Sequence, residues 1–263
     1  MSNARANVQA EENTGVSYFK SEAWHEKLLE KARYYNSLPG NLGFYNCDKC
    51  NNKGVIEYIN DDWDETCRVC DCMRIRSCYQ AMSRSGITED MIKRFRFDTF
   101  SVIQDYQAKI KQTALRYVQS DLTGWLLISG QSGTGKTHIC TACARYLLGK
   151  GYTVKYVLWH DVARRLAALR YKIDEYEAYM KEISDAEVLY IDDLFKSNKE
   201  TGAAFEVINQ RYMSRKPTII SSELFIGDIM AMDEATGSRL NEMSKDHCCQ
   251  IRNEPNRNYR NKE

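Results

Sequence analysis

Gly130-Gln131-Ser132-Gly133-Thr134-Gly135-Lys136-Thr137 is the stretch that decides the fold of this 263-residue chain. It fits the pattern G-x-x-x-x-G-K-[ST] at every fixed position, and it lies between an apolar run, residues 125–128, and a segment with helical character. The glycines let the backbone turn so that its N–H groups point inward, and the following helix adds the positive end of its dipole. A loop of this kind binds the phosphates of a nucleotide.

The side chains of this loop have separate expected roles. We expect Lys136 to be exposed and to hold the β- and γ-phosphates of ATP, while the Thr137 hydroxyl ligates Mg²⁺. The candidate nucleotide-contacting residues are Gly130, Gln131, Ser132, Gly133, Thr134, Gly135, Lys136, Thr137 and His138.

An acidic partner for the loop follows a second apolar run. Residues 188–191 lead directly into Asp192 and Asp193. We expect Asp192 to hold Mg²⁺ through water, and Asp193 to orient or deprotonate the attacking water. Many ATPases have Glu at the second position, and the shorter side chain of Asp193 therefore predicts slow hydrolysis.

Short apolar runs alternate with helical segments through the last two-thirds of the chain. This alternation predicts βαβ units and a mainly parallel sheet covered on both faces, which is an α/β fold. The expected strands are residues 125–128, 153–158, 188–191 and 218–220, and the expected helices are residues 136–148, a segment after Leu158 that Asp161 caps, and residues 201–213.

The front of the chain has a different character. Residues 1–16 lack periodic apolar positions and are expected to be flexible, while residues 18–35 have a helical pattern with Trp24 and Leu28 on one face. The domains expected from these changes are an N-terminal helical segment at residues 1–40, a cysteine module at 41–86 and an ATPase domain at 87–263.

Five of the ten cysteines gather in this front part. Cys47-x-x-Cys50 and Cys67-x-x-Cys70-x-Cys72 offer five thiols to a four-coordinate site, with the spacing of structural zinc. Spacing alone selects Cys67 and Cys70 as the second pair, but Cys70 and Cys72 could serve equally. The segment has too little apolar content for a core of its own, so Zn²⁺ would fold it. Basic residues that could offset the charge of the thiolates are Lys49, Lys53, Arg68, Arg74 and Arg76.

Composition limits the classes of partner. The net charge of +1 excludes a globally basic nucleic-acid binder, so any DNA contact must come from local patches. No apolar run approaches the ~18 residues of a membrane span, and the first thirty residues lack a secretory signal, so a cytoplasmic protein without a membrane partner is expected. Two candidate DNA patches mix basic and aromatic residues: Lys93, Arg94 and Arg96 with Phe95 and Phe97, and Arg164, Arg165 and Arg170 with Tyr171.

Taken together, these segments resemble the DnaC/DnaI-type replicative helicase loaders of the AAA+ ATPases, especially the versions carried by phages and mobile elements of Gram-positive bacteria. The resemblance covers most of the chain. It includes the N-terminal helix, the cysteine module with Cys70-Asp-Cys72-Met-Arg-Ile-Arg76, the loop at 130–137, Ile220-Ser-Ser-Glu-Leu224 and Gly237-Ser-Arg-Leu240. It implies an AAA+ P-loop ATPase core with a parallel sheet, preceded by a small helical and zinc-binding module.

The resemblance also assigns individual residues. It favours Cys70 and Cys72 as the second zinc pair, which together with Cys47 and Cys50 completes the metal set. It places Ser222 where AAA+ proteins have a polar sensor of the γ-phosphate. Arg239 falls where related loaders carry arginines that reach nucleotide. Since Ala235 stands where many of them have another arginine, Arg239 is a finger toward a neighbouring subunit, a sensor within its own subunit, or a surface charge.

Three functions follow as hypotheses. The first is an ATP-dependent loader of a DnaB-type replicative helicase onto single-stranded DNA, which assembles with itself on ATP and hydrolyses ATP weakly. The second is a transposition ATPase resembling IstB, although such proteins usually lack a cysteine-rich front module. The third is an adaptor that binds ATP without significant turnover.

Overall fold

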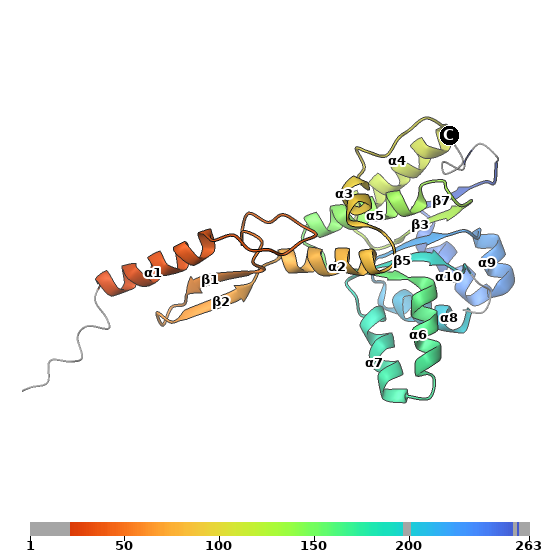
Figure 1. Cartoon of the computed structure of the whole chain (residues 1–263). Coiled ribbons are helices and arrows are strands. Elements are labelled where there is room, and N and C mark those ends of the chain that lie inside the picture. The colour runs from red at the N-terminus through yellow and green to blue at the C-terminus, as the bar shows by residue number, and fades with distance from the viewer. Residues whose placement is uncertain (1–21, 197–200, 255–256, 258–263) are drawn as a thin grey trace, which may run out of the picture. The chain divides into compact units, whose positions relative to one another are not determined.

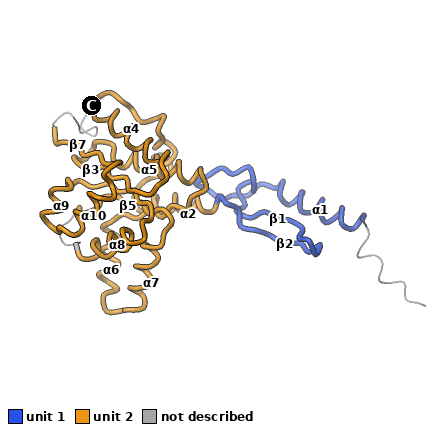
Figure 2. Tube along the Cα trace, turned by 180° about the vertical axis from the view of Figure 1, so that it is seen from behind, with its two compact units in different colours: residues 1–72 blue, residues 73–263 orange. Residues whose placement is uncertain are grey.

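The computed structural model describes residues 22–196, 201–254 and 257. The expected flexible end at residues 1–16 and the first residues of the expected N-terminal helix lie outside this part. Within it the chain forms two compact units, residues 1–72 and 73–263 (Figure 2). The helices are α1 Glu22–Ser37, α2 Cys72–Arg84, α3 Glu89–Arg94, α4 Asp105–Gln119, α5 Lys136–Gly149, α6 Trp159–Leu169, α7 Ile173–Ser184, α8 Thr201–Ser214, α9 Ile226–Met232 and α10 Glu234–Ser244. The strands are β1 Val55–Ile59, β2 Glu65–Val69, β3 Trp125–Gly130, β4 Val154–Leu158, β5 Val188–Leu194, β6 Thr218–Ser222 and β7 Cys248–Ile251.

The first unit is built from α1 and an antiparallel hairpin of β1 and β2. The side chain of Asn36 closes the free edge of β1, because its amide donates to Glu57 O at 2.7 Å and its carbonyl accepts from Glu57 N at 3.0 Å. The ammonium of Lys53 bonds three carbonyl groups at the end of α1. Among the described residues of this unit, the buried hydrophobic side chains are Ala32, Cys47, Cys50, Cys70 and Cys72. The cysteines therefore form most of its interior.

The second unit is a five-stranded parallel sheet with the order β4-β5-β6-β3-β7. Helices α4 and α5 pack on one face, and α6, α8 and α10 pack on the other (Figure 1). Every residue of β3 is buried, as expected for a central strand of a parallel sheet. The expected α/β fold is confirmed, and β6 separates the strand that precedes the glycine-rich loop from the strand that ends in the two aspartates.

Several boundaries differ from those expected. The units divide between Cys72 and Met73, whereas the sequence placed the change at residues 86–87. Helix α2 packs within the second unit, because Tyr79 and Met82 are buried and the guanidinium of Arg145 lies over the Tyr79 ring. Asp161 does not cap α6, which begins two residues earlier, at Trp159. Among the described residues, no helix combines the length and the apolar character that crossing a bilayer requires.

Candidate nucleotide site and cysteine cluster

The glycine-rich loop connects β3 to α5, and two of its glycines have no acceptable replacement. A Cβ on Gly130, whose φ is +122°, would lie 2.1 Å from the carbonyl oxygen of Ile251. A Cβ on Gly135, whose φ is +91°, would lie 2.9 Å from the Phe100 ring. Both glycines combine a left-handed backbone with close neighbours, so the loop shape depends on them.

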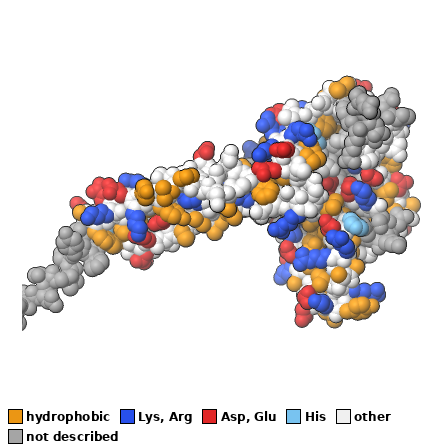
Figure 3. All heavy atoms as spheres, in the orientation of Figure 1, with side chains coloured by type: hydrophobic (Ala, Val, Ile, Leu, Met, Phe, Trp, Pro, Cys, Tyr) orange, Lys and Arg blue, Asp and Glu red, His pale blue; other side chains and the backbone are white. Residues whose placement is uncertain are grey.

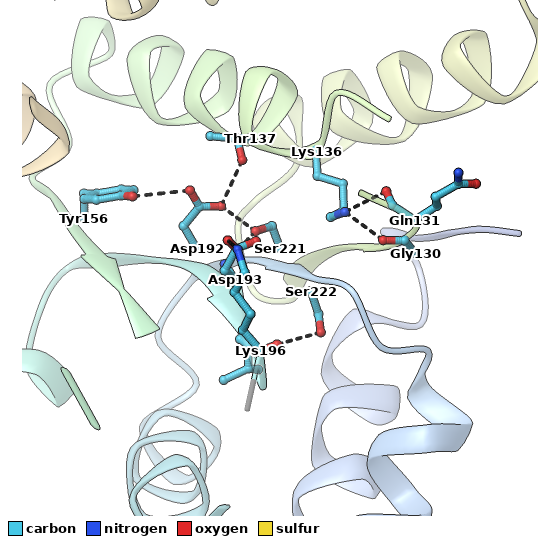
Figure 4. Close-up of polar contacts among 11 residues, drawn as sticks. Gly130, Gln131, Lys136, Thr137, Tyr156, Asp192, Asp193, Lys196, Ser221 and Ser222 are labelled. Carbon is cyan, nitrogen blue, oxygen red and sulfur yellow. Dashed lines mark hydrogen bonds and ion pairs between the residues drawn. The ribbon is translucent and has the colours of Figure 1, made fainter. Parts of the chain in front are cut away.

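Lys136 is buried, with 5% of its surface exposed, which corrects the expectation of an exposed lysine. Its ammonium donates to Gly130 O at 2.7 Å and to Gln131 O at 2.9 Å, so the side chain folds back over its own loop (Figure 4). Burial lowers the pKa of Lys136, and nearby carboxylates oppose this shift. A phosphate would therefore meet a lysine already held at the centre of the loop.

Asp192 lies at the end of β5 with three hydroxyl groups around its carboxylate (Figure 4). Oδ1 accepts from Ser221 Oγ and from Thr137 Oγ1, the latter at 3.4 Å, and Oδ2 accepts from Tyr156 Oη at 3.3 Å. Burial raises the pKa of Asp192, while the hydrogen bonds from Ser221 and Tyr156 lower it. The contact of Thr137 with Asp192 places together the hydroxyl and the carboxylate expected at Mg²⁺.

Asp193 differs from Asp192 in its surroundings. It has a φ of +55°, its N–H donates to Ser221 Oγ at 2.9 Å, and its Oδ2 forms an ion pair with Lys196 Nζ at 2.7 Å. The carboxylate expected to handle the attacking water is therefore paired with a lysine in this chain.

A cavity of about 630 Å³ connects these groups. Its charged side includes Lys136, Asp192 and Glu223, and its remaining wall comes from the segment before α4. The lining residues of that segment are Ser85, Gly86, Ile87, Met91, Arg94, Phe95, Thr99, Phe100 and Ser101. The apolar side chains of this wall, Ile87, Met91, Phe95 and Phe100, suit the flat base of a nucleotide, whose phosphates the loop would hold.

His138 joins the loop helix to that wall. Its ring stacks on Phe95 with centroids 4.6 Å apart, meets Phe100 edge-on, and its Nε2 lies 3.1 Å from Arg96 O. Burial lowers the pKa of His138. Of the residues expected to contact nucleotide, Ser132 through His138 line the cavity, whereas Gly130 and Gln131 do not.

Two predicted site residues lie elsewhere. Ser222 Oγ donates to Leu194 O at 2.7 Å, and Ser222 is not among the residues that line the cavity. Arg239 also lies outside the lining; its guanidinium covers the rings of Phe205 and Tyr212 at 5.2 and 5.5 Å. The structure instead brings Ser221, Tyr156 and Glu223 to the site. Ser221 and Glu223 carried a sequence signal, since they flank Ser222 in the stretch that the resemblance singles out, whereas Tyr156 carried none.

The first candidate DNA patch is largely occupied. Phe95 is buried against His138, Arg96 pairs with Asp98, and Lys93 pairs with Glu89 at 2.9 Å.

The second patch, on α6 and the turn to α7, is more open. Tyr171 is 88% exposed beside the guanidinium of Arg170, and Arg165 lies 4.0 Å over the Tyr179 ring. Basic and hydrophobic side chains lie side by side over α6 and α7 (Figure 3). This second patch is the better candidate for contacting single-stranded DNA.

The first unit brings together Cys47, Cys50, Cys70 and Cys72, whose sulfurs all lie within 4.8 Å of one another. Two of the separations are 3.7 Å (Cys47 to Cys70) and 3.6 Å (Cys50 to Cys72). A tetrahedral zinc site with Zn–S bonds of about 2.3 Å needs sulfurs about 3.8 Å apart. The donor set and its dimensions therefore fit Zn²⁺.

The surroundings of the cluster favour the thiolate at Cys50, whereas burial raises the pKa of the Cys70 thiol. The N–H of Gly54, a residue with a φ of +80°, donates to Cys50 Sγ at 3.3 Å. Burial raises the pKa of the Cys50 thiol, but this hydrogen bond and those of the neighbouring thiols bring it down to about 7. Cys67 is exposed on β2, opposite Glu57, and lies outside the cluster. The alternative that spacing left open, with Cys67 in the second pair, is not the arrangement found.

Comparison with known proteins finds a family whose model matches this chain. Residues 76–263 match the family model described as IstB-like ATP-binding protein. The uncharacterized protein YqaM of Bacillus subtilis (strain 168) is 31% identical over 208 residues, which span 73% of this chain and 66% of YqaM. The phage-like element PBSX protein XkdC of the same organism is 29% identical over 223 residues, which span 77% of this chain and 81% of XkdC.

Replication proteins appear among more distant matches. The replicative helicase loader DnaC of Buchnera aphidicola subsp. Acyrthosiphon pisum (strain APS) is 25% identical over 169 residues, which span 61% of this chain and 67% of that protein. A crystal structure of the DnaC helicase loader superposes with a TM-score of 0.53 and 24% identity, covering 60% of this chain and 99% of that one. The replication initiator DnaA bound to AMPPCP and single-stranded DNA superposes with a TM-score of 0.52 and 20% identity, covering 61% of this chain and 50% of that one. These superpositions show a shared fold.

Proposed function

This chain belongs to the family of IstB-like ATP-binding proteins, which includes an AAA+ core like that of the DnaC loaders, and we propose that it loads a DnaB-type replicative helicase onto single-stranded DNA under the control of ATP. The observation that carries the proposal is the compact cysteine unit in front of the ATPase core. The family model matches residues 76–263, so residues 22–72 form a separate folded unit outside the matched segment. Transposition ATPases of the IstB type usually lack a cysteine-rich front unit, so this unit favours the loader.

The ATPase core supplies the control. ATP would place its phosphates in the loop at residues 130–137, where Lys136 exchanges its carbonyl partners for phosphate oxygens. Thr137 and Asp192 would hold Mg²⁺, which supplies charge neutralisation at the phosphates when bound. The pairing of Asp193 with Lys196 supports slow hydrolysis in the isolated chain.

The cysteine unit would hold Zn²⁺ through Cys47, Cys50, Cys70 and Cys72 and bind the helicase. Its few buried side chains give little hydrophobic stabilisation, and a structural zinc is worth on the order of 10 kcal/mol in small domains. Helix α1 leaves Tyr34 68% exposed and Leu29 37% exposed, while Trp24 and Leu28 are half-buried. The outer face of α1, rather than the face with Trp24 and Leu28, is therefore the surface offered to a partner.

Single-stranded DNA would lie along the patch on α6 and α7, where Tyr171 can stack on a base and the arginines can follow phosphates. Self-assembly on ATP would bring Arg239 toward the nucleotide of a neighbouring copy, since in its own chain Arg239 lies outside the cavity.

A transposition ATPase is the alternative, because the family model that matches residues 76–263 is described as IstB-like ATP-binding protein. In that case the partners would be a transposase and duplex DNA. The two functions therefore differ in partner and in the form of DNA.

A loading assay with the full-length chain separates them. A DnaB-type helicase is incubated with circular single-stranded DNA coated with single-strand binding protein, and helicase on the circle is measured after gel filtration. We expect the chain with ATP to raise the bound helicase at least about tenfold, and Lys136→Ala to abolish this gain. Duplex DNA and the transposase encoded nearest the gene form the second arm. Capture of the transposase on duplex DNA without any helicase loading would overturn the proposal.

A further inference from the structure

Glu223 leaves the sheet between the two halves of the phosphate site. Strand β6 lies between β5 and β3, and the register pairs Ser222 with Ser129 on β3 and with Leu194 on β5. Because the strands are parallel, the residue after Ser222 emerges level with Gly130, the first glycine of the phosphate loop. Glu223 accordingly lines the nucleotide cavity together with Asp192 and Asp193.

The Glu223 carboxylate is available for chemistry. Across residues 22–196, 201–254 and 257 the structure gives it no hydrogen bond and no ion pair, and its side chain is exposed. Glu223 and Lys136 line the same cavity, so the carboxylate shares it with the ammonium that would hold the γ-phosphate.

Asp193 is less available for the same task. Its Oδ2 is 2.7 Å from Lys196 Nζ, and its N–H is bonded to Ser221 Oγ. One oxygen of the Asp193 carboxylate is therefore already bound by an ammonium, which an attacking water would have to displace. Glu223 is also longer by one methylene, so it spans more of the distance from the sheet edge to a phosphate.

We propose that Glu223 supplies the carboxylate that orients the attacking water and accepts its proton during ATP hydrolysis, while Lys196 holds Asp193 aside. In this step the water oxygen forms a bond to the γ-phosphorus, and the bond from that phosphorus to the β–γ bridging oxygen breaks. ADP leaves with the electron pair, and the proton of the water passes to Glu223 and then to solvent. The proposal rests on the ATPase activity proposed above and names the group that performs it.

Single-turnover cleavage by the full-length chain tests this role. An excess of protein is mixed with radiolabelled Mg·ATP, with and without a single-stranded oligonucleotide, and ATP and ADP are followed for hours. We expect Glu223→Gln to slow cleavage by roughly 100-fold or more, the usual contribution of general base catalysis. The Kd of the Glu223→Gln variant for ATP should stay within about threefold of the wild-type Kd. The nucleotide bound to this variant should therefore remain ATP, because binding is kept while cleavage is slow. Glu223→Asp should cleave at an intermediate rate, and Asp193→Asn should slow cleavage by less than about tenfold.

The outcomes distinguish a failure of the role given to Glu223 from a failure of the proposed ATPase activity. Cleavage by Glu223→Gln near the wild-type rate overturns the inference alone, and so does a loss in Asp193→Asn as large as that in Glu223→Gln. A wild-type chain that binds ATP but forms no ADP over the full time course contradicts both the ATPase activity and the inference. A wild-type chain that binds no ATP contradicts the nucleotide site itself, and with it both the ATPase activity and the inference.

Discussion

The hydroxyl of Tyr156 donates to Asp192 Oδ2 at 3.3 Å and thereby fixes the orientation of the carboxylate at the end of β5. The two residues belong to neighbouring parallel strands, and the register pairs Leu158 with Asp192, so Tyr156 lies two residues back along β4. With Tyr156 on Oδ2, the other oxygen faces Ser221 and Thr137. An edge strand thus sets the direction in which the expected Mg²⁺ ligand points.

Tyr156→Phe should raise the Mg²⁺ concentration needed for half-maximal ATP binding by about threefold to tenfold, because one hydrogen bond to a charged group is lost. The measurement is a Mg²⁺ titration of fluorescent ATP binding to the full-length chain. Tyr176→Phe is the matched control, since it removes a similar hydroxyl-to-carboxylate bond, to Glu206 at 2.8 Å, away from the nucleotide cavity. Equal Mg²⁺ requirements in the two variants would mean that Tyr156 does not position Asp192.

Asp192→Asn should stabilise the nucleotide-free fold and abolish the extra stability that Mg·ATP confers. Burial raises the pKa of Asp192 above its ordinary value of 3.8, so its ionised form destabilises the native state. The native state then holds more protons than the unfolded state at pH values above 3.8, and the stability due to this group is lost as pH rises through that window.

The gain from Asp192→Asn should therefore be larger at pH 7 than at pH 4, by an amount that thermal unfolding can resolve. Each kcal/mol shifts Tm by roughly 2–4 °C in a domain of this size. Thermal unfolding of both proteins from pH 4 to pH 8, without nucleotide, measures the difference. A gain that shrinks toward pH 7 would contradict the assigned direction of the pKa shift.

Much of the fold could be predicted from the sequence because the buried strands of a parallel sheet are continuous apolar runs. Residues 125–128 and 188–191 are such runs, and both form central strands. Strand β7 was missed, because Cys248–Ile251 is only four residues long and carries a glutamine. The hairpin was missed because β2 is almost wholly exposed, so its sequence has no alternation to detect.

The candidate site could be predicted where it is contiguous in sequence and not where it depends on register. The phosphate loop and the two aspartates are local motifs. Successive side chains of a strand point to opposite faces. Ser221 and Glu223 are each one residue from Ser222, so a difference of one residue in the assignment selects the opposite face of the strand. In the structure Ser221 contacts Asp192 and Glu223 lines the cavity, whereas Ser222 bonds the carbonyl of Leu194. Tyr156 had no motif at all, because its role comes only from the pairing of β4 with β5.

Cys47→Ser should lose the bound metal of the first unit, while Cys67→Ser should keep it. The Cys47 sulfur is buried within the cluster of four, whereas Cys67 is exposed outside it. We expect about one zinc per chain by elemental analysis in wild type and in Cys67→Ser, and less than about a third of that in Cys47→Ser. Both variants should bind ATP normally, because the nucleotide site lies entirely in the second unit. Metal loss in Cys67→Ser with retention in Cys47→Ser would show that the cluster is not the zinc site.

A chain that starts at Met73 should bind ATP, whereas a chain that starts at Ile87 should be destabilised and bind it poorly. The sequence placed the domain boundary at residue 87, but the compact unit begins at Met73 and includes α2. Starting at Ile87 removes the buried side chains of Tyr79 and Met82, and each large side chain lost from a core typically costs 2–5 kcal/mol. It also removes Ser85 and Gly86, which line the nucleotide cavity. Thermal unfolding with and without Mg·ATP compares the two fragments with the full-length chain. If the fragment from Ile87 unfolds at the same temperature as the fragment from Met73 and gains the same stability from Mg·ATP, then α2 is not part of the ATPase unit.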